Sequence, residues 1–194
     1  AYVNHYLHEH YLTGLFISFA IILAAAAKSA QFPFSSWLSR AMEGPTPSSA
    51  IFYGSVAVHI GVFLLLRTYP FWSVLPLVKW NVIGMGLTSA IIGSVSARVQ
   101  TSVKAQIAYS SIAQIGLIFI EVALGLHWIA LIHLTGNAFL RAYQLLISPS
   151  IVTYLIREQF FNYKPVKKSK DRTWRRLIKN SIFEIHIFMK LSLI

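Results

Sequence analysis

The sequence predicts an all-α protein, a polytopic bundle of transmembrane helices. Of its 194 residues, 56% are hydrophobic and only 12% are charged, whereas a soluble domain carries about 25% charged residues. Five long apolar segments also approach the roughly 20 residues that a helix needs to cross a bilayer, where each backbone polar group must be bonded within the segment. We therefore expect an integral membrane protein.

The apolar segments follow one another with short connections. They cover residues 12–27, 49–66, 82–97, 107–126 and 128–147, and the last extends toward residue 156. The run over residues 69–80 is interrupted by Pro70 and Pro76 and is rich in aromatic side chains, which favours a loop at the membrane interface over a span. We expect residues 1–155 to form the transmembrane domain and residues 156–194 to form a basic tail with a short apolar end.

The net charge of +11 is concentrated in this tail. Residues 1–155 hold 7 basic and 3 acidic side chains, and the last 39 residues hold 10 and 3. A basic cluster next to a membrane domain attracts anionic lipid headgroups, so we expect membrane lipid as a partner and no nucleic acid. Because Lys and Arg in short loops stay on the cytoplasmic side, we place the tail in the cytoplasm and the N-terminus outside.

Several kinds of site are excluded or weakly supported. The chain has no cysteine, which excludes disulfide scaffolds, thiolate metal sites and cysteine nucleophiles. No phosphate-binding glycine loop, Ser/His/Asp arrangement or cofactor motif is recognisable. His5, His8 and His10 lie close together, but they lack any further fixed ligand spacing, so we expect no metal and no cofactor. The chain begins at Ala1 without a signal peptide, and we expect it to be a fragment.

Lys28 is the first candidate for a functional residue inside the membrane. An ionisable side chain within a span is unfavourable in free energy, so its presence usually indicates a function. Lys28 follows the first apolar segment and precedes Pro33, which lacks a backbone N–H and disfavours helix in the residue before it. A lysine beside such a break suits an ion path, since unwound backbone supplies polar groups and water. The alternative is a lysine at the end of a span that reaches the interface.

His59, Tyr53 and Glu121 are further candidates. His59 lies in the middle of the second segment, and it can relay protons because histidine titrates near neutral pH. Its alternative is a neutral histidine that is hydrogen-bonded between helices. Tyr53 can contribute a hydroxyl, but it holds its own proton too tightly for ordinary relay. Glu121 lies close to the end of the fourth segment, as either a buried carboxyl on the ion path or a carboxylate with its head in water.

The fifth segment carries a polar stripe. His133, Asn137 and Arg141 are spaced four residues apart, which places them near one face of a helix. Arg141 cannot carry a proton at this stripe, but it can fix a positive potential, hold a carboxylate or order water. Gly136 would allow a close helix approach or a break, and Pro149 would end or kink the helix. The alternative for the stripe is a hydrogen-bonded seam between helices.

Three stretches carry a family resemblance: AKSAQFPFSSWLSRAMEGPTPSSA at residues 27–50, VKAQIAYSSIAQIGLIF at 103–119 and IHLTGNAFLRA at 132–142. They resemble the proton-conducting, antiporter-like membrane subunits of respiratory complex I and of Mrp-type cation/proton antiporters. The resemblance implies that the chain is part of a larger antiporter-like fold with broken helices and two inverted repeats. It also implies a transporter subunit rather than an enzyme.

The resemblance assigns roles by position. Lys28 matches the lysine of the family's broken helix, the central proton carrier, and His133 matches the first histidine of a later motif. Tyr53 and Asn137 stand where many relatives have histidines, and Arg141 stands where a relay lysine is expected. These departures put the usual relay of complex I subunits in doubt, because arginine replaces a group that must shuttle a proton.

Three further stretches, at residues 40–54, 58–68 and 137–150, look more like the membrane subunit of DAB-type inorganic carbon transporters. That branch implies a large zinc-containing, carbonic-anhydrase-like partner subunit that carries the zinc chemistry. We therefore predict a subunit of the bacterial inner membrane that conducts protons or Na+ to energise uptake of CO2 or bicarbonate by this partner.

In this prediction Lys28 is the ion carrier, His59 and His133 are relays through water, and Arg141 is an electrostatic gate. The first alternative is a proton-pumping subunit of an NADH-quinone oxidoreductase, or an Mrp antiporter subunit, with other membrane subunits as partners. The second alternative is a non-conducting membrane scaffold, in which these side chains form only structural hydrogen bonds.

Overall fold

The computed structural model describes residues 10–161, which are helical with short connections and contain no strand. The predicted all-α fold class is therefore confirmed. The elements in chain order are α2 (Tyr11–Lys28), α3 (Ser36–Ala41), α4 (Thr46–Ser48), the π-helix η1 (Ser49–Ala57), α5 (Val58–Trp72), α6 (Pro76–Val99), α7 (Val103–Ala123) and α8 (His127–Phe161). His5, His8 and residues 162–194 of the tail that we place in the cytoplasm lie outside the described residues, whereas residues 156–161 belong to α8.

Four helices in the described part of the chain are long and apolar enough to cross a membrane. They are Tyr11–Lys28, Thr46–Trp72, Pro76–Val99 and Val103–Ala123. The fifth predicted span lies within α8, which is long enough at 35 residues but is not among the four. Its polar stripe explains the difference, since charged and amide side chains lower the hydropathy of the segment.

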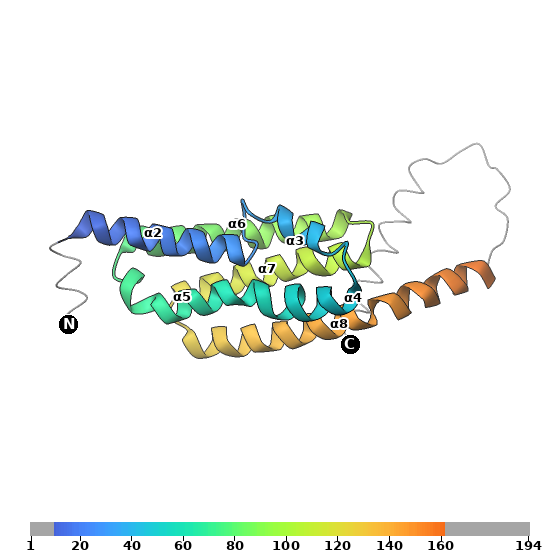
Figure 1. The fold of residues 1–194 in the computed structure, drawn as a ribbon. Helices are drawn as coiled ribbons and strands as arrows, with labels where there is room; N and C mark the ends of the chain where they lie inside the picture. The colour runs from blue at the N-terminus through green and yellow to red at the C-terminus, as the bar shows by residue number, and fades with distance from the viewer. Residues whose placement is uncertain (1–9, 162–194) are drawn as a thin grey trace, which may run out of the picture. The chain divides into compact units, whose positions relative to one another are not determined.

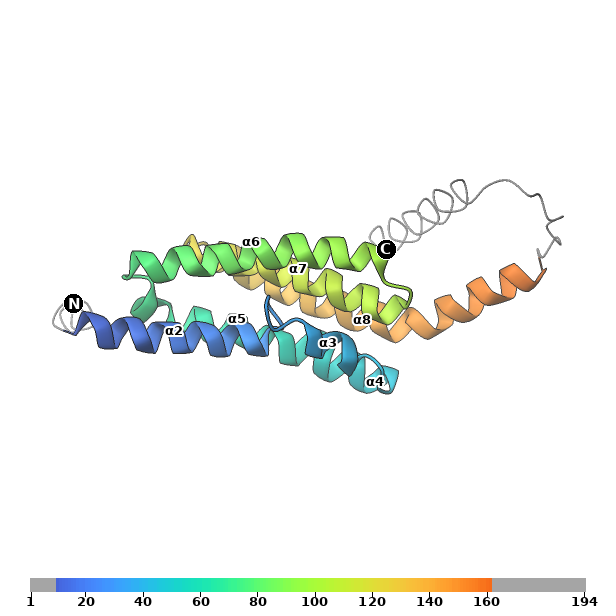
Figure 2. The same cartoon turned by 90° about the horizontal axis from the view of Figure 1, so that it is seen from above.

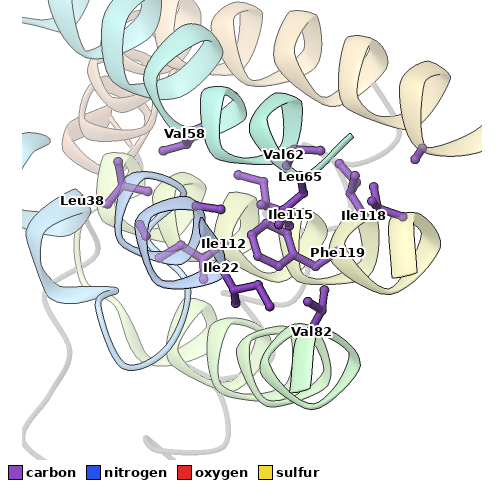
Figure 3. Close-up of a cluster of buried hydrophobic side chains, with 14 of the residues drawn as sticks. Ile22, Leu38, Val58, Val62, Leu65, Val82, Ile112, Ile115, Ile118 and Phe119 are labelled. Atoms are coloured by element: carbon purple, nitrogen blue, oxygen red, sulfur yellow. The ribbon is translucent and has the colours of Figure 1, made fainter. Parts of the chain in front are cut away.

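Helix pairs run side by side in the bundle. Helix α2 packs along α5, and α6 packs along α7, which also contacts α5 (Figures 1 and 2). The apolar faces of α2, α3, α5, α6 and α7 meet in one core, where Phe119 and Ile115 of α7 lie between Val62 of α5 and Ile22 of α2 (Figure 3). Helix α7 is the most deeply buried of the four spans, which makes it the centre of the bundle.

Helices α6 and α7 approach to backbone contact. A Cβ atom added at Gly86 would lie 2.5 Å from the carbonyl oxygen of Gly116, and one added at Gly116 would lie 2.5 Å from the carbonyl oxygen of Gly86. Small residues at a helix interface allow this approach in membranes, where association depends on packing rather than on the hydrophobic effect.

The predicted break after Lys28 is confirmed. Helix α2 ends at Lys28, and α3 begins only at Ser36, beyond Pro33. Side chains satisfy the backbone groups that the break releases: Trp37 Nε1 donates to Ala27 O at 3.0 Å, Gln31 Nε2 to Ser29 O at 3.0 Å, and Ser89 Oγ accepts from the Phe32 N–H at 2.9 Å. The break is therefore a bonded feature of the fold rather than frayed helix.

The predicted interfacial loop over residues 69–80 is wrong. Helix α5 continues through Pro70 to Trp72, α6 begins at Pro76, and only three residues separate them. Pro76 occupies the first turn of α6, where proline is tolerated because that N–H has no helical partner. Trp72 is fully buried, and its Nε1 donates to the carbonyl oxygen of Leu65 at 3.1 Å, so it is a core residue.

Helix α8 is continuous through Gly136 and Pro149. A Cβ atom at Gly136 would meet nothing within 4 Å, so the expected close approach or break at Gly136 is wrong. Pro149 lies inside the helix and does not end it. The chain forms two compact units, Ala1–Leu146 and Ile147–Ile194, and α8 begins in the first and ends in the second. The domain boundary that we expect after residue 155 stays a prediction.

Candidate functional site

His133 lies between two oxygen atoms of helix α7. Its Nδ1 is 2.7 Å from Oε1 of Glu121, and its Nε2 is 3.1 Å from Oε1 of Gln114. The side chains of His133 and Glu121 are 27% and 21% exposed, so most of their surface is removed from the surroundings. We call Gln114, Glu121 and His133 the His133 cluster. Glu121 is directed at a histidine of the next helix, which favours the buried interpretation of this carboxyl over the interfacial one.

A second group of polar side chains joins α8 to α5. Asn137 Nδ2 is 3.1 Å from Nε2 of His59, Arg141 Nε donates to Asn137 Oδ1 at 3.2 Å, and Arg141 Nη1 donates to Gln144 Oε1 at 2.7 Å. All four residues are between 5% and 7% exposed. We call His59, Asn137, Arg141 and Gln144 the Arg141 cluster.

The hydrogen bonds of Asn137 define the protonation of one nitrogen of His59. Arginine can only donate hydrogen bonds, so the oxygen of Asn137 must face Arg141. The amide nitrogen of Asn137 then faces His59 and donates to its Nε2. His59 Nε2 therefore acts as an acceptor, and a neutral His59 ring carries its proton on Nδ1.

Arg141 has no carboxylate partner among residues 10–161. Both of its bonds go to amide oxygens, those of Asn137 and Gln144. Of the three roles that we considered for Arg141, holding a carboxylate is not seen in this part of the chain. The other two roles, a fixed positive potential and the ordering of water, stay predictions.

Lys28 and Tyr53 join neither cluster. Lys28 is the last residue of α2 and is exposed in this chain. Its neighbour Ser29 is fully buried. Tyr53 lies in η1, and its ring and that of Trp37 form a T-shaped pair with centroids 6.4 Å apart. The structure thus brings five of the seven predicted residues into two clusters and leaves these two apart.

Sequence reasoning missed Gln114 and Gln144. Gln114 lies seven residues before Glu121, so both are on one face of α7, two turns apart. Gln144 lies three residues after Arg141, the spacing of neighbours on a helix surface. Helical spacing from the charged residues would have found both. No group of three or more residues suited to binding a metal occurs within residues 10–161.

Comparison with protein families shows to which family this chain belongs. The family model described as NADH:quinone oxidoreductase/Mrp antiporter, TM, matches residues 3–168. The chain belongs to this family. This family agrees with the superfamily that the three sequence stretches indicated.

Members of the NADH:quinone oxidoreductase/Mrp family resemble this chain over most of its length. NAD(P)H-quinone oxidoreductase subunit 5 of the chloroplast is 35% identical over 167 residues in Illicium oligandrum, covering 84% of this chain and 22% of the relative. The same subunit of Lolium perenne is 37% identical over 150 residues, covering 77% and 20%.

A solved structure, the Mrp complex from Dietzia sp. DQ12-45-1b, matches this chain with a TM-score of 0.66 and 33% identity. The match covers 69% of this chain and 15% of the matched chain in that complex. The chain spans about a fifth of the length of the curated relatives it matches.

Proposed function

We propose that this chain is part of a proton-translocating, antiporter-like membrane subunit of an NADH-quinone oxidoreductase or Mrp-type complex. The relatives described above favour this alternative over our first prediction of inorganic carbon uptake. Other membrane subunits of such a complex would be its partners. The observation that carries the proposal is the polar row on α8, in which His133 and Asn137 bond to side chains of the neighbouring spans and Arg141 bonds to Asn137.

The row supplies groups for a proton path. His133 and Glu121 share one short hydrogen bond, and a proton can move between a histidine and a carboxyl at this distance. His59 lies one turn of α8 farther along, where its Nε2 already accepts a hydrogen bond from Asn137. Water would connect these groups, because none of the described bonds joins His133 directly to Asn137.

Arg141 would act as a fixed charge beside this path. It keeps its proton at any physiological pH, so it cannot shuttle one, but its field opposes a second positive charge nearby. Arg141 thus takes the role of an electrostatic gate, and Asn137 orients it.

Lys28 would be the carrier at the helix break. Exposure of Lys28 in this chain is compatible with that role, because four-fifths of a full-length relative lies outside the chain and can cover this face. Ser29 ties the break to the residue that precedes His59: Ser29 Oγ donates to the carbonyl oxygen of Val58 at 2.6 Å.

The experiment is proton transport by the full-length protein in its complex, reconstituted in vesicles, with Lys28→Ala compared with Lys79→Ala. Lys79 lies in the first turn of α6, away from both clusters. Transport should fall at least tenfold in Lys28→Ala and stay normal in Lys79→Ala while both complexes remain assembled, since a relay group typically contributes 10²-fold or more. Normal transport in Lys28→Ala would support the non-conducting scaffold.

A second candidate is the membrane subunit of a DAB-type inorganic carbon transporter in the bacterial inner membrane, working with a zinc-containing, carbonic-anhydrase-like subunit. Asn137 and Arg141 favour it, because they replace the histidine and lysine expected of a complex I relay. Two measurements separate the candidates: the subunits that co-purify with the full-length protein, and carbon-limited growth of cells that carry its gene. Co-purifying quinone oxidoreductase or antiporter subunits support the first candidate, whereas a large zinc protein and carbon-dependent growth support the second.

A further inference from the structure

We propose that Gln114 is a positioning residue that keeps a permanent proton on Nε2 of His133, so that the proton exchanged by His133 is the one between its Nδ1 and Glu121. The inference deepens the proposed function, and its consequence for proton transport rests on that function. The protonation state of the His133 ring is inferred from the geometry of its two contacts. No part of the family resemblance assigned a role to Gln114.

Both nitrogens of His133 face oxygen atoms. Oε1 of Glu121 lies 2.7 Å from Nδ1, and Oε1 of Gln114 lies 3.1 Å from Nε2. An amide oxygen can only accept a hydrogen bond, so the Gln114 contact is favourable only when Nε2 carries a proton. A bare Nε2 would place two lone pairs against each other in a site that is mostly withdrawn from water.

Glu121 determines how the other ring nitrogen, Nδ1, is hydrogen-bonded. With Nε2 protonated, two states remain for the short contact: an imidazolium that donates from Nδ1 to the carboxylate, and a neutral ring that accepts at Nδ1 from the protonated carboxyl. Both states hold one proton between Nδ1 and Oε1. The two differ only in the side of the hydrogen bond on which that proton lies.

In this arrangement the His133 cluster exchanges protons on one side of the ring only. Loading and unloading occur at the Glu121 side of the ring, because the Gln114 side is already filled. A proton that leaves the pair passes from Nδ1 or Oε1 to a water molecule, which becomes hydronium. The pair is left as a neutral Nε2–H ring beside a carboxylate, and this carboxylate must turn away from the bare Nδ1 because two lone pairs would otherwise face each other. Nε2 keeps its proton throughout the exchange.

The other charged and titratable groups near His133 do not compete for Nε2. Arg141 lies two turns farther along α8 and bonds to Asn137 and Gln144. His59 of α5 bonds to Asn137. Within residues 10–161, Gln114 is the hydrogen-bond partner of His133 Nε2.

Histidine-selective ¹⁵N labelling of the full-length protein in its complex tests the state of the ring. The His133 signals are identified by their loss in His133→Asn. We expect Nε2 of His133 to be protonated in the wild type and in Gln114→Glu, which keeps an acceptor oxygen. We expect Nε2 to become partly unprotonated in Gln114→Met, which has a similar size but no strong acceptor. An unprotonated Nε2 in the wild type, or an unchanged Nε2 in Gln114→Met, overturns the inference.

Proton transport provides the second readout, with Gln106→Met as the matched control. Gln106 is buried on the same helix and joins neither cluster. Transport should fall about tenfold in Gln114→Met, the factor expected for one lost hydrogen bond, and stay normal in Gln106→Met. If the wild type transports no protons although Nε2 is protonated, the proposed function fails and the assignment of Gln114 stands. If the wild type transports protons with Nε2 unprotonated, the reverse holds.

Discussion

Ser29 Oγ donates a hydrogen bond of 2.6 Å to the carbonyl oxygen of Val58. Ser29 directly follows Lys28 at the break of α2, and Val58 directly precedes His59 near the middle of the 27-residue span Thr46–Trp72. The break therefore lies at the level of the middle of that span. This position favours the ion-path interpretation of Lys28 over a lysine that ends a span at the interface.

Removal of this hydrogen bond should destabilise the bundle. In Ser29→Ala the carbonyl of Val58 loses one buried hydrogen bond, and we expect unfolding to become easier by about 0.5–1.5 kcal/mol, the net contribution of one such bond. Thermal unfolding of the full-length protein in detergent measures the change. Ser94→Ala is the control, because the Ser94 hydroxyl is exposed and bonds only within its own helix. Equal stability of the two variants would contradict the prediction.

Asn137 should be needed to hold the Arg141 cluster together. Asn137→Leu removes the bonds to both His59 and Arg141, and we expect a loss of about 2–3 kcal/mol because two buried groups lose a partner. The same unfolding measurement applies. Thr135→Leu on the same helix is the control, since its side chain is exposed and bonds only to the carbonyl of Leu131. A loss no larger than that of Thr135→Leu would mean that water replaces the amide.

We expect proton transport to depend on the positive charge of Arg141 more than on the hydrogen bonds of its guanidinium group. Arg141→Lys keeps the positive charge but cannot reproduce both bonds of the guanidinium, so we expect lower stability and transport within about threefold of the wild type. Arg141→Met removes the charge, and we expect transport to change by at least tenfold if the charge gates the path. Transport assays in vesicles compare the two variants. Equal effects of both would show that only the hydrogen-bond network counts.

Glu121 should be necessary for transport. Glu121→Gln keeps the size and one oxygen but removes the group that shares a proton with His133, and we expect transport to fall at least tenfold. Glu43→Gln is the control, because Glu43 is exposed between α3 and α4. Both complexes must be present in the membrane in equal amount. Wild-type rates in Glu121→Gln would exclude this carboxyl from the path.

The contact between α6 and α7 should not tolerate a methyl group. Gly86→Ala would place Cβ 2.5 Å from the carbonyl oxygen of Gly116, and we expect a loss of about 1–3 kcal/mol from overpacking. Gly84→Ala on the same helix meets nothing within 4 Å and should be neutral or slightly stabilising, because alanine favours helix. Yield and melting temperature of the two variants provide the comparison.

The sequence by itself determined the helical membrane fold and the helix break after Lys28. It also identified most of the polar residues that form the two clusters. The composition and the apolar runs determine the fold class because the bilayer admits few alternatives. Pro33 locates the break because it cannot donate a backbone hydrogen bond. His59, Asn137 and Arg141 were visible because polar residues are rare in apolar segments.

The ends of the helices depended on context. Pro70 and Pro76 suggested an interfacial loop, yet the helices continue almost to each other because Trp72 is held in the core by a bond to Leu65. Proline is compatible with the first turn of a helix, as at Pro76, whereas a proline inside a helix costs a backbone hydrogen bond, as at Pro70. Sequence alone therefore favoured a loop over a short turn between two helices. Gly136 shows the converse, since a glycine without a close neighbour leaves the helix intact.

Only the tertiary structure decided which polar residues act together. Glu121 and His133 are twelve residues apart on consecutive helices, and His59 and Asn137 are separated by 78 residues. Helical spacing gives the face on which a residue lies, but it does not give the rotation or the axial position of one helix against another. Those are set by packing, here by the apolar core around Phe119, to which α8 contributes Ala130 and Leu145, because side chains in a close-packed bundle meet in one arrangement.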